Sequence, residues 1–459
     1  MLDVSSDKSL VKTTEDKFGV VSVDDTAYLE ASPGKHSLIT KDEHSHRAKL
    51  FASWNRNKPV DRTLDSSDGV IMVSYFLPVI LTRKTNGSWV ASWDREALLS
   101  ALNSTALQVS RVIWVGSVRY GNAPIPVEDE EAVTAVLAEL NCIPVFINQS
   151  MHIKFYEGFC KKSLWLILHH VADVYGPLQQ SDKSMKIEQD LWFNYSTVHK
   201  NFREKVLEVY QPGYLIWIHG LHLMLLPNFL RRRLPQAKIG YFFHTPFPSS
   251  EIWRTMSRRE DLLRGLLGAD QIGFHLYEYA RHFLTTCHRL LGYTHEMTSN
   301  GLMSVNVDGR QVSIACIHVG VDMFRLQEVF AATIFKTDLL AWKEKFPKKL
   351  LISGVDRLER LKAIPLRLMA VDRFLENNPN WIGKVVFTLI GISAGERGQD
   401  YKQTVHDVRI LVDRINEKFR PLDPTGVIYF EERPERDFKL AQRLPYFAAA
   451  DILLMAATR

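Results

Sequence analysis

The sequence predicts an α/β protein with two Rossmann-like domains that face each other across a central cleft. Short, continuous apolar runs alternate with amphipathic segments, and such runs are typical of strands buried on both faces of a parallel sheet. These strand–helix pairs form two series, which a helical spacer at 323–346 separates. We therefore predict a polar, disordered arm at 1–66, a first domain at 67–325 and a second domain at 326–459.

The first series begins with GVIMVSYFLPVIL at 69–81, a buried strand with its exit loop. A further strand ends before Asp94, where a helix is expected to begin. The helix at 191–210 has an apolar stripe of helical period, which favours core packing. The other strands of this series are predicted at 111–118, 142–147, 214–218, 239–243 and 312–322, and the other helices at 130–140, 155–170, 222–233, 258–268 and 277–291.

The second series begins with the strand LLISGVD at 350–356. Pro365 follows, in the first turn of a predicted helix, where proline is favoured. Three more strands are predicted at 384–392, 426–432 and 451–457, with a helix at 401–418. Because the sequence stops on leaving the last strand, we expect this second domain to be incomplete.

The charge of the chain is modest and widely spread. The net charge is +5 over 459 residues, and a hydrophobic content of 46% is sufficient for a sizeable core. The one dense basic cluster, Arg231 to Arg233, follows a predicted helix, where cations interact favourably with the helix dipole. We expect these three arginines to face solvent, and we expect no nucleic-acid partner.

The four cysteines argue for reducing surroundings. They lie far apart in the sequence without a CxxC pair, which argues against a disulfide framework and against a zinc site: Cys142, Cys160, Cys287 and Cys316. The first residues have no apolar core of a signal peptide, and no apolar run is long enough to span a membrane. The expected compartment is the cytoplasm, without a membrane partner.

Polar side chains follow two adjacent predicted strands in the stretch from Trp217 to Arg254. His219 and His222 follow the first strand, and His244 follows the second, before a Pro-Ser-Ser-Glu turn. Ligands of open α/β sheets bind beyond the carboxyl ends of the strands, so these histidines predict a ligand site. Two plainer interpretations stay open: each histidine can be structural, and the turn can simply begin a helix.

A second candidate site lies in SGVDRLERLKAIP at 353–365. A strand ends there, the following loop contains Arg357 and Lys362, and a helix begins near Ala363. Two cations beside a helix N-terminus suit an anionic diphosphate. The glycine spacing of a Walker loop is absent, and a solvated charged loop is the alternative interpretation.

The run HTPFPSSEIWRTM, followed by LLRGLLGADQIGFHLYEYARHFLTTCHRLLG, resembles the trehalose-6-phosphate synthases of glycosyltransferase family 20. The segments SWVASWD and EERPERDF look closest to the plant-type class II branch. The resemblance implies the GT-B fold, in which two Rossmann-like domains enclose the cleft. It also implies transfer of glucose from UDP-glucose to glucose 6-phosphate with retention, without a metal or other cofactor.

The resemblance assigns roles by position. The segment 353–365 is similar to the family's GVDRLDYIKG motif, so Arg357 and Lys362 are expected to hold the diphosphate, and His244 matches the histidine that contacts the donor sugar. These three are the expected catalytic residues, since a cationic clamp stabilises the leaving group. The residues matching the acceptor side are Tyr156, Trp165, His219 and His222.

Five motifs of the family are changed or absent here. HDYHL is here HGLHL, so Gly220 replaces an acidic residue, and VSNRLP is VSYFLP, so Tyr75 and Phe76 replace Asn and a phosphate-binding Arg. The second phosphate arginine, in the family's PSR, is replaced in GISAGERG, and Arg397, a few residues on, is the alternative residue that would compensate. Ala363 replaces a glycine as a mild change, and the DGMNLVAKE segment does not follow Arg459. Two lost arginine contacts cost about 3–6 kcal/mol, or about 10²–10⁴-fold in affinity.

The residues expected to hold the diphosphate of UDP-glucose are thus largely kept, whereas those expected to hold glucose 6-phosphate are largely lost. The sequence predicts a trehalose-6-phosphate synthase-like glucosyltransferase with weak or impaired activity. The alternatives are a catalytically inactive regulatory subunit or sugar-phosphate sensor, and a transferase with an acceptor that lacks a phosphate. Expected partners are UDP-glucose and glucose 6-phosphate, with assembly as a homo-oligomer or with other trehalose-synthesis subunits.

Overall fold

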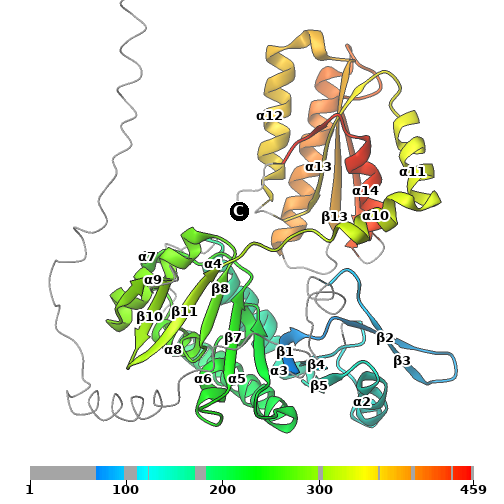
Figure 1. The fold of residues 1–459 in the computed structure, drawn as a ribbon. Coiled ribbons are helices and arrows are strands. Elements are labelled where there is room, and N and C mark those ends of the chain that lie inside the picture. Colours follow the sequence, from blue (N-terminus) through cyan, green and yellow to red (C-terminus); the bar gives the residue numbers. More distant parts are fainter. Residues whose placement is uncertain are drawn as a thin grey trace, which may run out of the picture. The chain divides into compact units, whose positions relative to one another are not determined.

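The computed structural model describes residues 69–97, 111–121, 123–170, 182–297, 303–359, 362–393, 399–435 and 438–455. Within them the chain forms two open sheets, each flanked by helices, and a separate two-stranded hairpin (Figure 1). The predicted arm at 1–66 and the residue Arg397 lie outside the described residues. Of the helix predicted to begin near Asp94, only residues 94–97 are described, and they form a turn.

The larger sheet has nine strands in the order β5-β4-β1-β6-β7-β8-β11-β10-β9. It is parallel from β5 to β11, and the antiparallel β10 and β9 complete the edge. The strands are β1 (Gly69–Phe76), β4 (Arg111–Ser117), β5 (Cys142–Val145), β6 (Leu215–His219), β7 (Lys238–Phe243), β8 (Gln271–Phe274), β9 (His295–Met297), β10 (Met303–Val307) and β11 (Arg310–Cys316). The predicted parallel strands of the first series are confirmed, whereas β8, β9 and β10 are additional.

The predicted strand at 69–81 is two strands, because a separate hairpin follows β1. This hairpin joins β2 (Val79–Arg83) to β3 (Trp89–Trp93) in antiparallel pairing. Its inner side chains, Leu81 and Trp89, are buried in a cluster beneath β1 and β4.

Helices cover both faces of the larger sheet. The long α5 (Asp182–Val209) buries Tyr195, Val198 and Phe202 of the predicted apolar stripe. The helix predicted at 222–233 is instead broken into two short pieces, η4 (Leu221–Leu223) and α6 (Leu226–Arg231). The other elements are η2 (Val127–Asp129), α2 (Glu130–Ala138), α3 (Gln149–His152), η3 (Ile153–Trp165), α4 (Leu166–Leu168), α7 (Ser250–Trp253), α8 (Arg259–Leu266) and α9 (Tyr277–Leu291).

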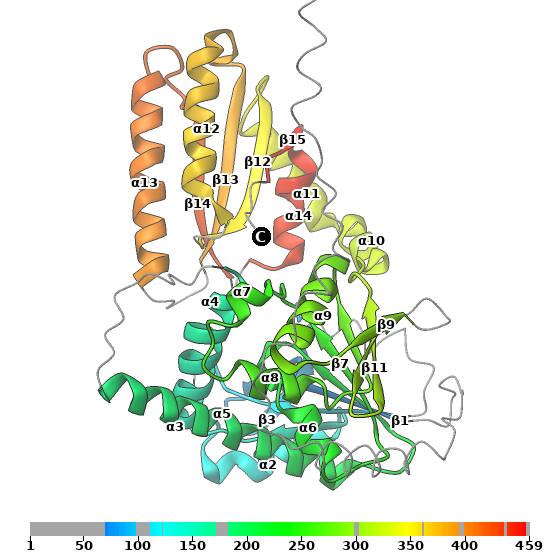
Figure 2. The ribbon, with the colours of Figure 1, turned by 90° about the vertical axis from the view of Figure 1, so that its left-hand side faces the viewer.

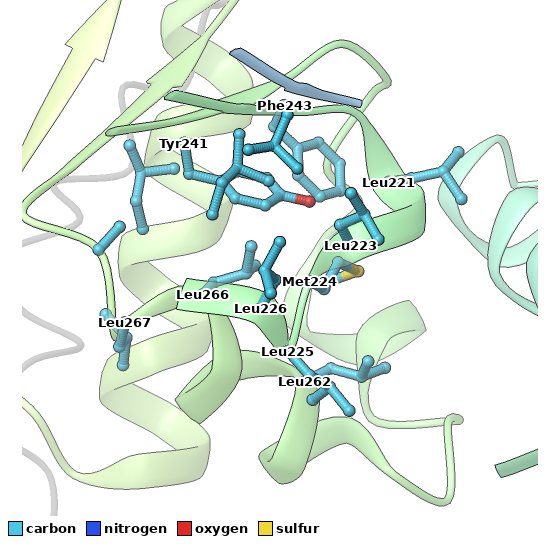
Figure 3. Packing of buried hydrophobic residues seen from close by; sticks show 14 of the residues in the cluster. Leu221, Leu223, Met224, Leu225, Leu226, Tyr241, Phe243, Leu262, Leu266 and Leu267 are labelled. Atoms are coloured by element: carbon cyan, nitrogen blue, oxygen red, sulfur yellow. The ribbon is translucent and has the colours of Figure 1, made fainter. Parts of the chain in front are cut away.

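The break between η4 and α6 places a dense run of apolar residues in the core. The apolar residues of 221–226 pack beneath Tyr241 and Phe243 of β7, with Leu262 and Leu266 of α8 nearby: Leu221, Leu223, Met224, Leu225 and Leu226 (Figure 3). Gly268 lies at the end of this layer, where an added Cβ would lie 2.3 Å from the Asn228 nitrogen. Only glycine allows this approach of two backbone segments.

The smaller sheet has four strands in the order β14-β13-β12-β15, and all are parallel. Its helices lie on both faces: α12 and α13 cover one face, and α11 and α14 cover the other (Figure 2). The predicted strand at 451–457 is only two residues long in the described part. The elements are α10 (Met323–Ala331), α11 (Thr333–Glu344), β12 (Leu350–Arg357), α12 (Ile364–Asn377), η6 (Pro379–Trp381), β13 (Val385–Ser393), α13 (Gln399–Phe419), β14 (Ile428–Pro434), α14 (Leu440–Ala449) and β15 (Ile452–Leu453).

The expectation that Arg231 faces solvent is wrong, although Arg232 and Arg233 are exposed. Arg231 is 9% exposed, and its guanidinium donates to the Ala237 carbonyl at 2.7 Å and to the Asp270 carboxylate at 2.6 Å. The same carboxylate accepts from the Ile239 amide at 2.8 Å. Arg231 therefore ties the end of α6 to the starts of β7 and β8, and a charge in this position must be paired.

No helix in the part of the chain that the structure describes is both long and apolar enough to cross a membrane.

We predict that Arg231→Met lowers the free energy of unfolding by about 1–3 kcal/mol, because it leaves the buried carbonyls of Ala237 and Gly268 without their donor. Urea unfolding followed by circular dichroism measures the change. Arg232→Met is the matched control, since an exposed substitution is expected to change stability by less than about 0.5 kcal/mol. Equal effects of the two substitutions would contradict a structural role of Arg231.

Candidate functional site

Four histidines form a row along the carboxyl edge of the larger sheet. His219 ends β6, His244 and His275 directly follow β7 and β8, and His318 lies two residues beyond β11. Adjacent rings are close, with centroids 5.3 Å apart for His219 and His244, 5.5 Å for His244 and His275, and 5.3 Å for His275 and His318. Neighbouring parallel strands end at the same edge, and this places the four rings side by side. We call these residues the histidine row.

His219 and His244 of the row are neutral at ordinary pH. Burial, together with the neighbouring imidazole, lowers the pKa of His219 to about 3 and of His244 to about 4. His219 Nδ1 lies 3.0 Å from His244 Nε2, so one ring donates and the other accepts. Within the described residues, His219 Nε2, His244 Nδ1 and the Thr245 hydroxyl are buried without a hydrogen-bond partner. Neutral donors and acceptors of this kind suit sugar hydroxyls.

A second cluster, the aromatic stack, consists of Tyr75, His152, Tyr156 and His222. The rings of Tyr75, Tyr156 and His222 are nearly parallel, with centroids 5.3 Å to 5.4 Å apart for every pair. The Tyr75 hydroxyl lies 2.9 Å from His152 Nδ1. Tyr75 is 2% exposed, and burial raises its pKa, so the phenol keeps its proton.

Two cations border the aromatic stack. Lys161 Nζ lies 5.3 Å from the centroid of Tyr156 and 5.9 Å from that of Trp165, at distances typical of cation–π contacts. Arg119 donates to the Gln149 side chain at 2.7 Å, and its charge adds to burial in lowering the pKa of His152 to about 4. The cluster is therefore apolar in its rings and cationic at its border.

Tyr156 and Trp165 lie on η3, which is a π-helix of 13 residues rather than the α-helix expected at 155–170. π-Helices are rare and occur mostly at functional sites. Asn148 caps the preceding α3 by accepting from the Met151 amide at 2.9 Å. The wider turn of η3 thus begins directly after a well-capped segment.

The predicted cationic loop follows β12. Arg357 is the last residue of the strand, its side chain is 45% exposed, and it forms an ion pair with Glu435. The Lys362 amide donates to the Glu359 carbonyl at 3.0 Å, which closes the turn before α12. Beneath the loop, buried Arg367 donates to the Asp356 carboxylate at 2.6 Å and fixes the end of β12.

Ala363 is more than the mild change that the sequence suggested. It is the N-cap of α12 and has φ of +48°, in the left-handed region where glycine is favoured. An alanine there costs about 1–2 kcal/mol in backbone strain. The loop that contains Lys362 is therefore held in a strained conformation.

The sequence-predicted residues thus fall into three groups. His219 and His244 lie together in the histidine row, Tyr156 and His222 lie together in the aromatic stack, and Trp165 joins Tyr156 through Lys161. Arg357 and Lys362 lie in one loop of the smaller sheet.

Sequence reasoning missed His152, His275, His318 and the ion-pair partner Glu435. His275 follows β8, a strand that the sequence analysis did not predict, and His318 fell inside the strand predicted at 312–322, which ends at Cys316. The signal that identified His244, a position just after a predicted strand, was therefore absent for both. Among the described residues, no group of three or more His, Cys, Asp or Glu is placed to hold a metal ion.

Comparison with known proteins identifies the family of this chain. The model of glycosyltransferase family 20 matches residues 68–459. Alpha,alpha-trehalose-phosphate synthase (UDP-forming) 6 of Arabidopsis thaliana is 35% identical over 88% of this chain and 48% of its own length. The chain therefore spans about half the length of the curated relatives it matches.

Two solved structures show the same fold. The N-terminal domain of a Candida albicans trehalose-6-phosphate phosphatase is 26% identical with a TM-score of 0.70, covering 87% of this chain and 79% of that one. An E. coli structure described as bound with UDP-2-fluoro glucose is 22% identical with a TM-score of 0.66, covering 85% and 79%. The predicted GT-B class is thereby confirmed.

We predict that Ala363→Gly raises the free energy of unfolding by about 0.5–1 kcal/mol, since it relieves the left-handed strain at the start of α12. Ala370→Gly is the matched control, because this exposed residue lies in the middle of the same helix and glycine there costs about 1 kcal/mol. Urea unfolding of both variants should give changes of opposite sign. A loss of stability in both would contradict the strain at Ala363.

Proposed function

Because the chain belongs to glycosyltransferase family 20, we propose that it is a trehalose-6-phosphate synthase-type glucosyltransferase of trehalose biosynthesis with impaired transfer. In this proposal it binds UDP-glucose and passes glucose slowly, with retention, to glucose 6-phosphate. One observation supports the donor half above all: Arg357 and Lys362 flank the turn between β12 and α12, where an anionic diphosphate is favoured.

The two cations would act on the leaving group. As the bond between the sugar carbon and the diphosphate oxygen breaks, negative charge grows on the UDP oxygens, and Arg357 and Lys362 would stabilise it. The acceptor hydroxyl would attack from the same face, and its proton would pass to the departing diphosphate. The proposed reaction is thus balanced without a metal or a further cofactor.

His244 would bind the donor sugar as a neutral ring. Its pKa of about 4 keeps it uncharged, and its Nδ1 is buried without a partner within the described residues. A neutral imidazole can donate to or accept from a sugar hydroxyl without a counter-ion. His219, in contact with His244, would fix the tautomer that does so.

Glu435 would compete with the diphosphate for Arg357. The two side chains form an ion pair in which both partners are partly exposed. An exposed pair of this kind is worth about 0–1 kcal/mol, so a diphosphate can displace Glu435 at little cost. When UDP-glucose binds, Arg357 would therefore exchange the carboxylate of Glu435 for the two phosphates of the donor.

The acceptor half supports the impaired activity in this proposal. Tyr75 stacks on both Tyr156 and His222, the residues expected to contact the acceptor. Phe76, in place of a phosphate-binding arginine, contacts Tyr156 edge-on with centroids 5.3 Å apart. An acceptor would need to separate these rings and would find Arg119 and Lys161 as the nearby cations.

The stacking of Tyr75 on Tyr156 and His222 also favours a second candidate. This is a non-catalytic regulatory subunit or sugar-phosphate sensor that associates with other trehalose-synthesis subunits. Closed aromatic stacking would then allow donor binding without turnover. The fold also occurs in the N-terminal domain of a protein named a phosphatase, so it does not by itself imply synthase activity. A transferase for an acceptor without a phosphate is the third candidate, since Tyr75 and Phe76 suit an uncharged sugar face.

The donor site is tested by calorimetric titration with UDP-glucose. We expect Arg357→Ala to weaken binding by about 10–150-fold, the equivalent of one lost charge-assisted contact. Glu435→Gln should tighten binding by up to about fivefold, because it removes the competing carboxylate. Glu432→Gln is the matched control, since Glu432 pairs with Arg409 instead and should leave the affinity unchanged. Donor binding that does not respond to Arg357→Ala would refute the assigned clamp.

The acceptor site is tested with the double variant Tyr75→Asn, Phe76→Arg, followed by glucose 6-phosphate-dependent release of UDP. We expect release to rise by about 10–150-fold over the unsubstituted chain, since one cationic contact to the phosphate is regained. Unchanged UDP-glucose affinity, without any turnover in either protein, would support the sensor instead. Turnover that is fast before substitution would show that the aromatic stack does not impair transfer.

A further inference from the structure

A cavity of about 400 Å³ lies against the smaller sheet, between α11, β14 and α14. The residues that line it are spaced as the side chains on one face of a helix or strand are. On α11 and its C-cap Lys345 the lining residues recur at helical spacing from Asp338 onward, and on β14 they alternate from Tyr429 to Arg433. The volume falls in the range of small-molecule sites, about 300–1,000 Å³. None of the predicted donor or acceptor residues lines it.

Four aromatic side chains form the apolar wall of this cavity. Trp342 contacts Tyr446 with centroids 4.6 Å apart and Tyr429 at 5.4 Å, and Phe438 contacts Tyr446 at 5.6 Å. Trp342 is 8% exposed, and its indole Nε1 is buried without a partner within the described residues. The aromatic wall is therefore firmly packed, and a buried indole donor is left unused in it.

A continuous chain of polar contacts borders the aromatic wall and shares Tyr429 with it, with Lys345 Nζ 3.9 Å from the centroid of the Tyr429 ring. Lys345 Nζ donates to the Tyr429 hydroxyl at 2.6 Å, this hydroxyl donates to the Glu431 carboxylate at 2.9 Å, and Arg433 pairs with Glu431 at 2.5 Å. Asp338 and the amide of Gln442 also line the cavity. Two cationic and two anionic side chains thus face it, and their formal charges cancel.

We propose that this cavity binds a neutral pyranose sugar, as a site separate from the proposed donor and acceptor sites. The C–H face of a pyranose packs on aromatic rings, and its hydroxyls pair with carboxylates, amides and cationic donors, which are the two kinds of group that line the cavity. The balanced charge disfavours an anion such as a sugar phosphate or a nucleotide, because an unmatched charge would remain. The site adds carbohydrate recognition on the sheet face opposite α12 and α13.

The test is a titration of the whole chain with maltose, followed by calorimetry and by saturation-transfer NMR. We expect a dissociation constant of about 1 mM or tighter, and a loss of about tenfold or more in affinity in Tyr446→Ala and in Gln442→Ala. Gln442 is exposed on α14, so its substitution tests the site even if Tyr446→Ala fails to fold. Lys343→Ala, on the outer side of α11, is the matched control and should bind maltose normally.

Arg357→Ala separates this site from the donor site. Maltose affinity that is unchanged in Arg357→Ala and reduced in Gln442→Ala supports the proposal. Three results would overturn it: no maltose binding up to about 10 mM, binding that Arg357→Ala abolishes and Gln442→Ala does not, or displacement of bound maltose by uridine.

Discussion

The alignment of parallel strands is the constraint on which the candidate sites depend. Because β6, β7, β8 and β11 are neighbours in register, their carboxyl ends share one edge, and each strand places one histidine there. The sheet cannot tilt or slip without separating these rings. The buried Arg231, which holds the starts of β7 and β8 through Asp270 and nearby carbonyls, protects this alignment from the opposite end.

Desolvation decides the chemistry of the histidine row and the aromatic stack. Burial lowers the pKa of His152, His219 and His244 to about 3–4, so these rings stay neutral from that range upward. In the unfolded chain they take up protons near their ordinary pKa of 6.5. Above about pH 6.5 the rings are neutral in both states, and the free energy of unfolding is at its full value. As the pH falls from there toward about 4, only the unfolded chain takes up these protons, which lowers the free energy of unfolding. Both clusters are built for hydrogen bonding and stacking rather than for charge.

The two halves of the proposed reaction differ in where their cations lie. Arg357 and Lys362 sit where a helix N-terminus adds its own favourable field, although Ala363 strains the turn. At the acceptor side, Tyr75 and Phe76 fill the space with rings, and the remaining cations lie at the border. Under the proposed function, this asymmetry favours a nucleotide sugar over a sugar phosphate.

The sequence by itself determined the α/β class, most of the parallel strands, the histidines that follow β6 and β7, and the cationic loop, because these depend on local periodicity and on residues at strand ends. Tertiary structure decided the burial of Arg231, the broken helix at η4 and α6, and the partners of the candidate residues. Tyr75 meets His152 across 77 residues of sequence, and Arg357 meets Glu435 across 78. Such contacts depend on how strands are ordered in a sheet, and no pattern within one segment specifies that order.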